Sequence, residues 1–152
     1  MSPKAIGILF AVATAIFWGL YGPALQKSRI DGQTPFKPFI FIGIAYLVWG
    51  CLGGAVAVQV TGSGFSFPAK AAWWGFIAGS LGAFGALTLT YAMFRAKDAS
   101  LVMPVVFGGA TAVAAITGLI LQARAGNLHV DYRQIIGFLL VIVGVVLIQK
   151  YS

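Results

Sequence analysis

Four long stretches of this sequence contain no charged residue, and they limit the fold more than any other feature. The charge-free stretches are residues 5–26, 38–69, 71–94 and 99–123, and the shortest of them is 22 residues long. An α-helix of about 20 apolar residues crosses the hydrocarbon core of a bilayer, which is about 30 Å thick. Each stretch therefore predicts a membrane-spanning helix.

A fifth charge-free stretch is shorter and depends on its flanks to cross a bilayer. Residues 134–149 are 16 positions, which reach about 24 Å as an α-helix. Tyr132 and Arg133 precede this stretch, and Lys150 and Tyr151 follow it. Aromatic rings lie at membrane interfaces, and long cationic side chains extend outward into water. With these flanks the stretch predicts a fifth spanning helix.

The five stretches predict an all-α integral membrane protein, folded as a five-helix transmembrane bundle. The connections between them are short, and all except residues 96–99 contain Gly or Pro, which is typical of turns. We therefore expect one transmembrane domain over residues 1–152. The expected helices are 5–26, 38–60, 71–95, 100–122 and 134–150.

The composition excludes soluble and nucleic-acid-binding proteins. Charged residues make up 9% of the chain and hydrophobic residues 60%, whereas about 25% of the residues in a soluble domain are charged. The ten Lys and Arg residues are scattered between apolar stretches, whereas a surface that binds nucleic-acid phosphates needs them clustered. We interpret them as membrane anchors and expect lipid, not nucleic acid, around the chain.

The reactive side chains are too few for most enzymes. The chain has one His, one Cys and three acidic residues, all of them Asp, which leaves little for acid–base catalysis or metal binding. Cys51 is expected to be a small buried hydrophobic residue, and His129 a solvated residue of a connecting loop. We expect no enzymatic activity, no metal and no cofactor.

Small residues recur at the spacing that suits close packing of membrane helices. Lipid tails are as apolar as leucine, so helices in a bilayer associate where small residues let their backbones approach. Each of three expected helices carries such residues four positions apart. The residues expected to pack are Gly50, Gly54, Gly75, Gly79, Ala110, Ala114 and Gly118.

Polar and aromatic residues fall on one face of the first, third and fourth expected helices. Three such stripes predict a shared, partly wet cavity, although each hydroxyl could instead bond its own helix or a neighbour. No ionisable residue lies near the middle of any span, which favours a neutral, zwitterionic or amphipathic solute. The expected solute contacts are Trp18, Tyr21, Thr88, Tyr91 and Thr111, with Pro104 bending its helix.

Three segments resemble the EamA-like domain of the drug/metabolite transporter superfamily. The first helix reads ATAIFWGLYGPALQK, in which Trp18, Gly19 and Lys27 fit the Trp-Gly signature that opens the domain. Two later segments are similar to the family's early-proline helix and final short helix. They read YAMFRAKDASLVMPVVFGGATAVAAITGLIL and YRQIIGFLLVIVGVVLI. The chain departs from the family at Gln122, where members usually carry an acidic residue.

The resemblance implies a transporter or exporter of a small metabolite in a bacterial-type inner membrane. The five helices would equal one inverted repeat of a ten-helix transporter, with the solute site between two such units. A second copy of the chain, preferably antiparallel, or a paralogue would supply the other unit. The alternative is a non-transporting accessory or assembly subunit of a membrane complex. The residues do not distinguish a sugar, an amino acid, a nucleoside or a lipid-like solute.

The charges in the loops favour neither orientation strongly. Cationic loops stay on the cytoplasmic side of a membrane, so the two sides can be compared. One side would hold Lys4, Lys70, Arg124 and Arg133, and the other Lys27, Arg29, Lys37, Arg95, Lys97 and Lys150. The N-terminal amine narrows this difference. So weak a bias suits insertion in both orientations, as an antiparallel homodimer requires; a parallel dimer and a hetero-pair are the alternatives.

Overall fold

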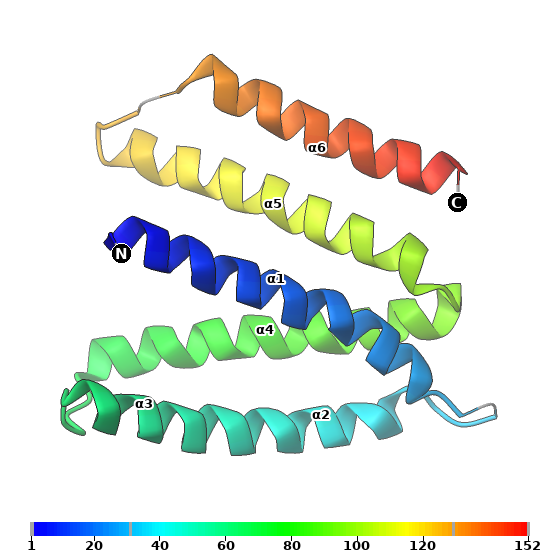
Figure 1. Ribbon diagram of the computed structural model, residues 1–152, viewed down its shortest axis with the longest axis horizontal. Helices are drawn as coiled ribbons and strands as arrows, with labels where there is room; N and C mark the ends of the chain where they lie inside the picture. Colours follow the sequence, from blue (N-terminus) through cyan, green and yellow to red (C-terminus); the bar gives the residue numbers. More distant parts are fainter. Residues whose placement is uncertain (1, 31, 129, 152) are drawn as a thin grey trace. The chain divides into compact units, whose positions relative to one another are not determined.

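The computed structural model describes residues 2–30, 32–128 and 130–151, and all regular structure in this part of the chain is helical (Figure 1). The elements are α1 (Pro3–Lys27), α2 (Phe36–Val48), η1 (Trp49–Gly53), α3 (Gly54–Thr61), α4 (Ala69–Ala96), α5 (Ala99–Arg124) and α6 (Tyr132–Tyr151). His129, expected to be a solvated loop residue, lies outside the described residues.

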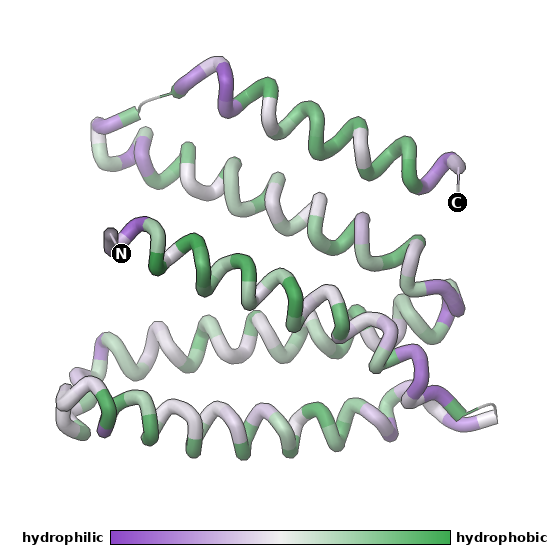
Figure 2. Tube along the Cα trace, viewed as in Figure 1, coloured by the Kyte–Doolittle hydropathy of each residue, from purple (hydrophilic) through white to green (hydrophobic). Residues whose placement is uncertain are grey.

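Five helical segments are long and apolar enough to cross a membrane, as the sequence predicts. Four are α1, α4, α5 and α6, and the fifth is the continuous segment Phe36–Thr61, which α2, η1 and α3 form together. Each segment extends one or two residues beyond its predicted ends. Figure 2 shows hydrophobic residues along the helices and hydrophilic ones at their ends. The all-α class and the five predicted helices of spanning length are confirmed, and they are compatible with an integral membrane protein.

The described chain divides into two units, each with internal packing of its own. The first unit joins the chain up to Pro23 with the chain from Ala96 onward, and the second is Ala24–Arg95. One division falls at Pro23, inside α1, where proline has no backbone N–H to give to the helix. The expectation of a single domain over residues 1–152 stays a prediction.

In the first unit, α5 and α6 pack side by side as antiparallel neighbours. Gly108 of α5 lies directly against a side-chain methyl group of Val145, at a place where no Cβ would fit. One end of the same pair is joined by a hydrogen bond, which the Gln149 side-chain amide donates to the Leu101 carbonyl oxygen. Because the earlier residue of α5 meets the later residue of α6, the two contacts fix the antiparallel register.

The first unit also brings α1 and α5 together at a glycine. A Cβ at Gly22 would lie 2.7 Å from Met103 Cγ and 2.8 Å from its Sδ. Met103 is buried, with 8% of its surface exposed. The flexible thioether of methionine fills irregular gaps between elements, and here it fills the space that the missing side chain of Gly22 leaves.

The second span contains a π turn that the sequence analysis did not predict. The expected helix 38–60 is α-helical on both sides of η1, and η1 itself has π-helical geometry. Its sequence is WGCLG, and its two glycines, which have no Cβ, leave the backbone less restricted at this point of the span. The span ends at Gly62, whose φ of +65° is the left-handed conformation that commonly terminates a helix.

The small residues predicted to pack helices do not form close helix contacts within the described part of the chain. A Cβ at Gly50, Gly54, Gly75, Gly79 or Gly118 would meet no atom within 4 Å beyond its own helix backbone. Ala110 and Ala114 are likewise exposed. Their role in packing therefore stays a prediction, and it would require another chain as the partner. The expectation that Cys51 is buried is wrong, because no described residue of the span Phe36–Thr61 is buried.

We expect Gly108→Ala to destabilise the protein. The added methyl group would overlap Val145, a β-branched residue with few alternative rotamers. Overpacking of this kind costs about 1–3 kcal/mol, so the midpoint of thermal unfolding in detergent should fall.

Gly109→Ala is the matched control for this substitution, because a Cβ at Gly109 meets nothing within 4 Å. The double variant Gly108→Ala/Val145→Ala should recover the midpoint, since the smaller side chain makes room for the new methyl group. Equal effects of the two glycine substitutions would contradict the packing of α5 on α6.

Candidate functional site

The structure distributes the predicted solute contacts over both units. Trp18, Tyr21, Pro104 and Thr111 belong to the first unit, and Thr88 and Tyr91 to the second. Each group is built from two elements of its own unit, and each includes one aromatic residue that the sequence analysis did not select as a contact.

In the first unit, three aromatic rings from α1 and α5 meet. The centroids of the Trp18 and Tyr21 rings lie 5.6 Å apart with a tilt of 47°. Phe107 of α5 meets Trp18 edge-on, at 6.3 Å and 86°. Edge-to-face and tilted pairs at such distances are favourable because the positive ring edge faces the negative ring face. We call these three residues the aromatic trio.

Pro104 lies inside α5, one turn before Phe107 of the trio. Phe107 follows Pro104 by three residues, so the two lie on the same face of α5. Proline has no N–H, so the Ser100 carbonyl lacks its usual helical donor at this position. A proline inside a helix loosens it locally, close to the turn that presents Phe107 to Trp18.

In the second unit, Tyr91 of α4 stacks on Phe36 of α2. The two rings are nearly parallel, with an interplanar angle of 6° and centroids 6.4 Å apart. Tyr91 is 49% exposed, and Thr88 and Arg95 on the same face are also exposed. The other face of α4 is the buried one. It consists of Ala86, Leu89, Thr90 and Met93.

Ser and Thr hydroxyl groups on α1, α4 and α5 donate to carbonyls of their own helices. Thr111 donates to the Phe107 carbonyl at 2.8 Å, and Thr88 reaches the Phe84 and Gly85 carbonyls at 3.0 Å. Thr14 and Ser80 donate to carbonyls four residues earlier in the same way. These hydroxyls therefore use their protons for hydrogen bonds within their own helix, which was the alternative to lining a cavity. Each oxygen keeps lone pairs that can accept a hydrogen bond.

Trp49 is a residue of interest that the sequence analysis missed. It begins the π turn near the middle of the span Phe36–Thr61 and is 74% exposed. Tryptophan is enriched at membrane interfaces instead of mid-span, and π turns within α-helices are frequent at functional sites. The readable signal was the segment WGCLGG, which places a tryptophan beside three glycines at the centre of an apolar stretch.

Neither the aromatic trio nor the Tyr91–Phe36 pair contains a His, Cys, Asp or Glu residue. Within the ranges that the structure describes, no three His, Cys, Asp or Glu side chains lie together as a metal site would require. The aromatic trio and the Tyr91–Phe36 pair instead offer ring faces and hydroxyl groups. Such surfaces suit binding of a small organic molecule, in which apolar walls carry a few polar groups.

Comparisons with known proteins find no relative of this chain. Neither family models nor curated proteins nor solved structures match it. The resemblance to EamA-like domains therefore depends on the three sequence segments alone.

The start of α5, close to Pro104, is held by a side-chain cap. Asp98 has extended backbone geometry and accepts hydrogen bonds from the Ser100 hydroxyl at 2.7 Å and the Ser100 N–H at 2.8 Å. These two bonds, the hydroxyl bond first, lower the pKa of the Asp98 carboxyl below its ordinary value. The cap satisfies one of the N–H groups that a helix start leaves without a partner.

We expect Asp98→Ala to fray the first turn of α5, seen as faster hydrogen exchange of the peptide containing Ser100. Because the folded pKa is depressed, the stabilisation is complete above the ordinary carboxyl pKa of about 3.9. It is lost as the pH falls below that value through the folded pKa. Protection in the native protein should therefore stay constant from neutral pH down to about pH 4 and fall only below it. Asp98→Asn should lack this pH dependence. If that variant showed the same pH dependence as the native protein, the result would contradict the cap.

Proposed function

We propose that this protein is a transporter for a small neutral, zwitterionic or amphipathic metabolite, acting as a pair of five-helix units in a bacterial-type inner membrane. The observation that carries the proposal is the aromatic trio. It joins rings from two apolar spans beside a proline, in a region of the sequence without charge.

The chemistry of the trio favours an uncharged or internally neutral solute. Trp18 and Tyr21 combine a broad apolar face with a polar edge, as aromatic residues in small-molecule sites commonly do. A solute with a net charge would lose its hydration in the membrane and meet no opposite charge in these spans. The rings can instead stack on a planar or apolar part of the solute.

Thr88 and Tyr91 form a second group of solute contacts within this proposal. Tyr91 is held by its stacking on Phe36, while half of its surface stays accessible. The oxygen of Thr88 can accept a hydrogen bond one turn away on the same exposed face. These two residues offer one ring and one acceptor, a combination suited to a solute with a donor group.

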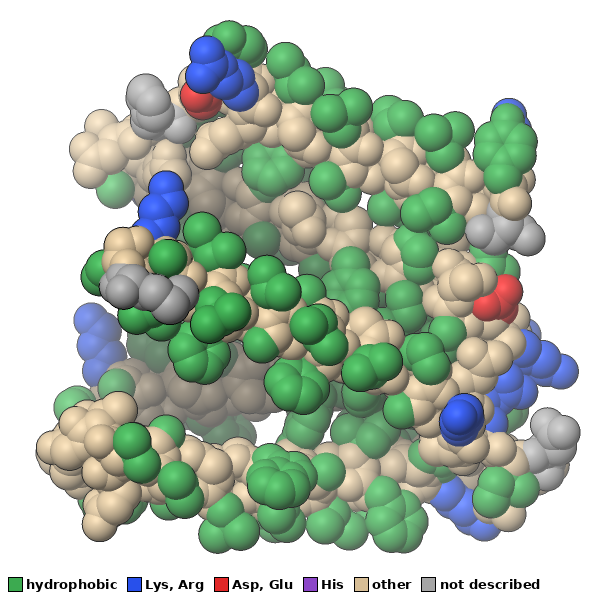
Figure 3. All heavy atoms as spheres, viewed as in Figure 1, with side chains coloured by type: hydrophobic (Ala, Val, Ile, Leu, Met, Phe, Trp, Pro, Cys, Tyr) green, Lys and Arg blue, Asp and Glu red, His purple; other side chains and the backbone are tan. Residues whose placement is uncertain are grey.

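A second copy of the chain completes the proposed transporter. One chain leaves the span Phe36–Thr61 without a buried residue, and the glycines of its predicted packing pairs stay uncovered. Figure 3 shows hydrophobic side chains along the helices with Lys and Arg near their ends. Close approach of small residues is what associates helices in a bilayer, and ten-helix transporters of inverted repeats bind solute between their halves.

The second candidate function is that of an accessory subunit of a membrane complex. The uncovered glycines at positions 50, 54, 75 and 79 favour it, because a different protein could pack there as well as a second copy. Purified protein in liposomes distinguishes the two. A transporter moves solute or is stabilised against heat by a metabolite, whereas an accessory subunit alone does neither.

A thermal-shift screen of metabolite classes supplies the ligand for the next test. Trp18→Ala and Tyr91→Ala should each weaken its binding about tenfold or more, as truncation of a central aromatic contact commonly does. Phe17→Ala and Phe84→Ala are matched controls, because these rings are 73% and 66% exposed on the same two helices. The Trp18→Ala and Tyr91→Ala variants should stay monodisperse. Aggregation of the Trp18 and Tyr91 variants, with full binding in the folded fraction, would make these residues packing elements.

Antiparallel pairing requires that the chain insert in both orientations. Single cysteines at Ser28 and Ser63, which flank the span Phe36–Thr61 on either side, should each be labelled partly from both faces of intact cells. The background is Cys51→Ser, because Cys51 is exposed in one chain. Complete labelling of each position from a single face would contradict dual insertion and leave a parallel dimer or a hetero-pair.

A further inference from the structure

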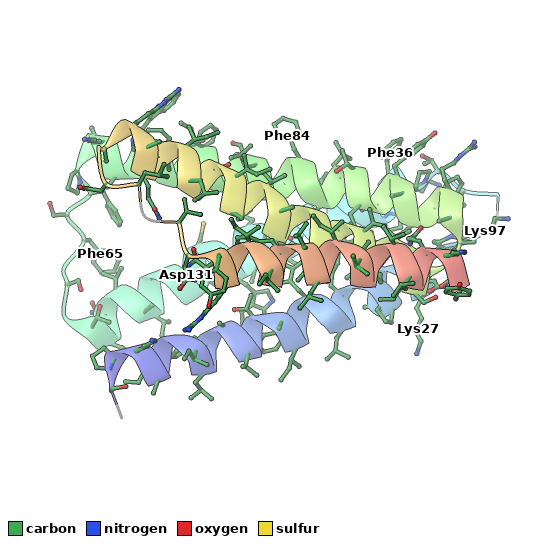
Figure 4. All side chains as sticks on the ribbon, turned by 90° about the horizontal axis from the view of Figure 1, so that it is seen from above. Lys27, Phe36, Phe65, Phe84, Lys97 and Asp131 are labelled. Atoms are coloured by element: carbon green, nitrogen blue, oxygen red, sulfur yellow. The ribbon has the colours of Figure 1, made fainter. Side chains whose placement is uncertain are left out.

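Basic side chains gather at one end of the second unit. The Arg29 guanidinium lies over the Phe94 ring of α4, with its carbon 5.6 Å from the ring centroid. Arg95 follows Phe94, and Lys37 follows Phe36, whose ring stacks on Tyr91 one turn before Arg95. Lys27 ends α1 two residues before Arg29. Figure 4 shows Lys27 and Phe36 at the end of the unit that lies away from Phe65.

Arg29 is the member of this group that contacts the Phe94 ring. A cation over an aromatic face is attracted by the electron density of the ring, so the contact with Phe94 limits the positions of the guanidinium. The Arg29 Nε is buried and has no hydrogen-bond partner among the described residues. A guanidinium is planar, always charged and able to donate two parallel hydrogen bonds to a phosphate.

Opposite charge is scarce around these four residues. Between residues 24 and 95 the sequence contains a single acidic residue, Asp31, which lies outside the described residues. Lys27, Arg29, Lys37 and Arg95 therefore outnumber the acids of their own unit four to one. An excess of this kind attracts anions, and the attraction is strongest where the side chains are close to one another.

The position of the group selects the type of anion. Lys27 and Arg95 lie in the last turns of α1 and α4, and Lys37 lies in the first turn of α2. The ends of membrane spans lie at the level of the lipid headgroups. Exposed apolar side chains adjoin the charges, with Ile30 at 61% and Ile40 at 64% exposure. A phospholipid presents a phosphate beside acyl chains in this same arrangement. A free phosphate ion has no apolar group that could contact the exposed apolar side chains.

We propose that this basic group binds the phosphate of an anionic phospholipid, with Arg29 as the central contact and Lys27, Lys37 and Arg95 around it. The site is independent of the transport function proposed above and uses none of its residues. Basic residues near the cytoplasmic end of membrane helices attract anionic lipid headgroups. The contact of Arg29 with Phe94 distinguishes this site from a general excess of positive charge. The lipid would hold the ends of three helical elements together.

The experiment measures thermal unfolding of the purified protein in neutral detergent with added lipid. Phosphatidylglycerol should raise the midpoint above the value with phosphatidylcholine, because a ligand bound only to the folded state stabilises it. Arg29→Gln should lose more than about half of this shift. Arg124→Gln is the matched control, since it removes the same charge from the end of another helix. Both variants should match the wild type in phosphatidylcholine.

Two further measurements separate the sources of the effect. Inorganic phosphate at the same concentration should give little or no shift, because it lacks acyl chains. Asp31→Asn should keep or enlarge the shift, since it removes the single acid between residues 24 and 95. An equal loss in the Arg29 and Arg124 variants would overturn the proposal. An equal shift from phosphatidylcholine or from inorganic phosphate, or loss of the shift in Asp31→Asn, would overturn it as well.

Discussion

The absence of water from the hydrocarbon core governs this structure. A backbone N–H or carbonyl without a partner is costly there, so each spanning segment must satisfy its own backbone as a helix. The side chains follow the same requirement. Thr88 and Thr111 return their protons to carbonyls of their own helices, and the charged cap of α5, Asp98, lies between spans. The charges are placed where water or headgroups reach them, which is why Arg29 and its basic neighbours gather at the ends of spans.

The same solvent changes what holds helices together. Burial of apolar surface cannot associate helices whose surroundings are already apolar, so close approach and shape decide which ones meet. In the first unit, Gly108 admits Val145 and Gly22 admits Met103. The aromatic trio lies on the same two helices, α1 and α5, that meet at Gly22. The contact that packs these helices therefore also places Phe107 against Trp18, and packing and the proposed solute contacts depend on each other.

The candidate site was predictable in part. Trp18 and Tyr21 could be placed on one face because helical spacing requires it, and their rings do lie together. Their partner Phe107 was not predicted as a contact, because the rotation of α5 about its axis decides which ring meets Trp18. Phe36 was not recognised as the partner of Tyr91, which depends on how α2 and α4 meet. The π turn at Trp49 was missed because helical periodicity assumes uniform winding through an apolar stretch.

The sequence by itself determined the number of spans, their ends to within two residues, and the level at which charges lie. These properties depend on composition summed over some 20 residues, and the energy of transferring such a segment into lipid outweighs local detail. Only the tertiary structure decided which glycines are contacts. Gly50 and Gly108 lie in equally apolar surroundings, yet only Gly108 meets a neighbouring side chain. That distinction depends on the rotation and register of two separate helices, and no sequence window of one helix's length contains both contacting residues.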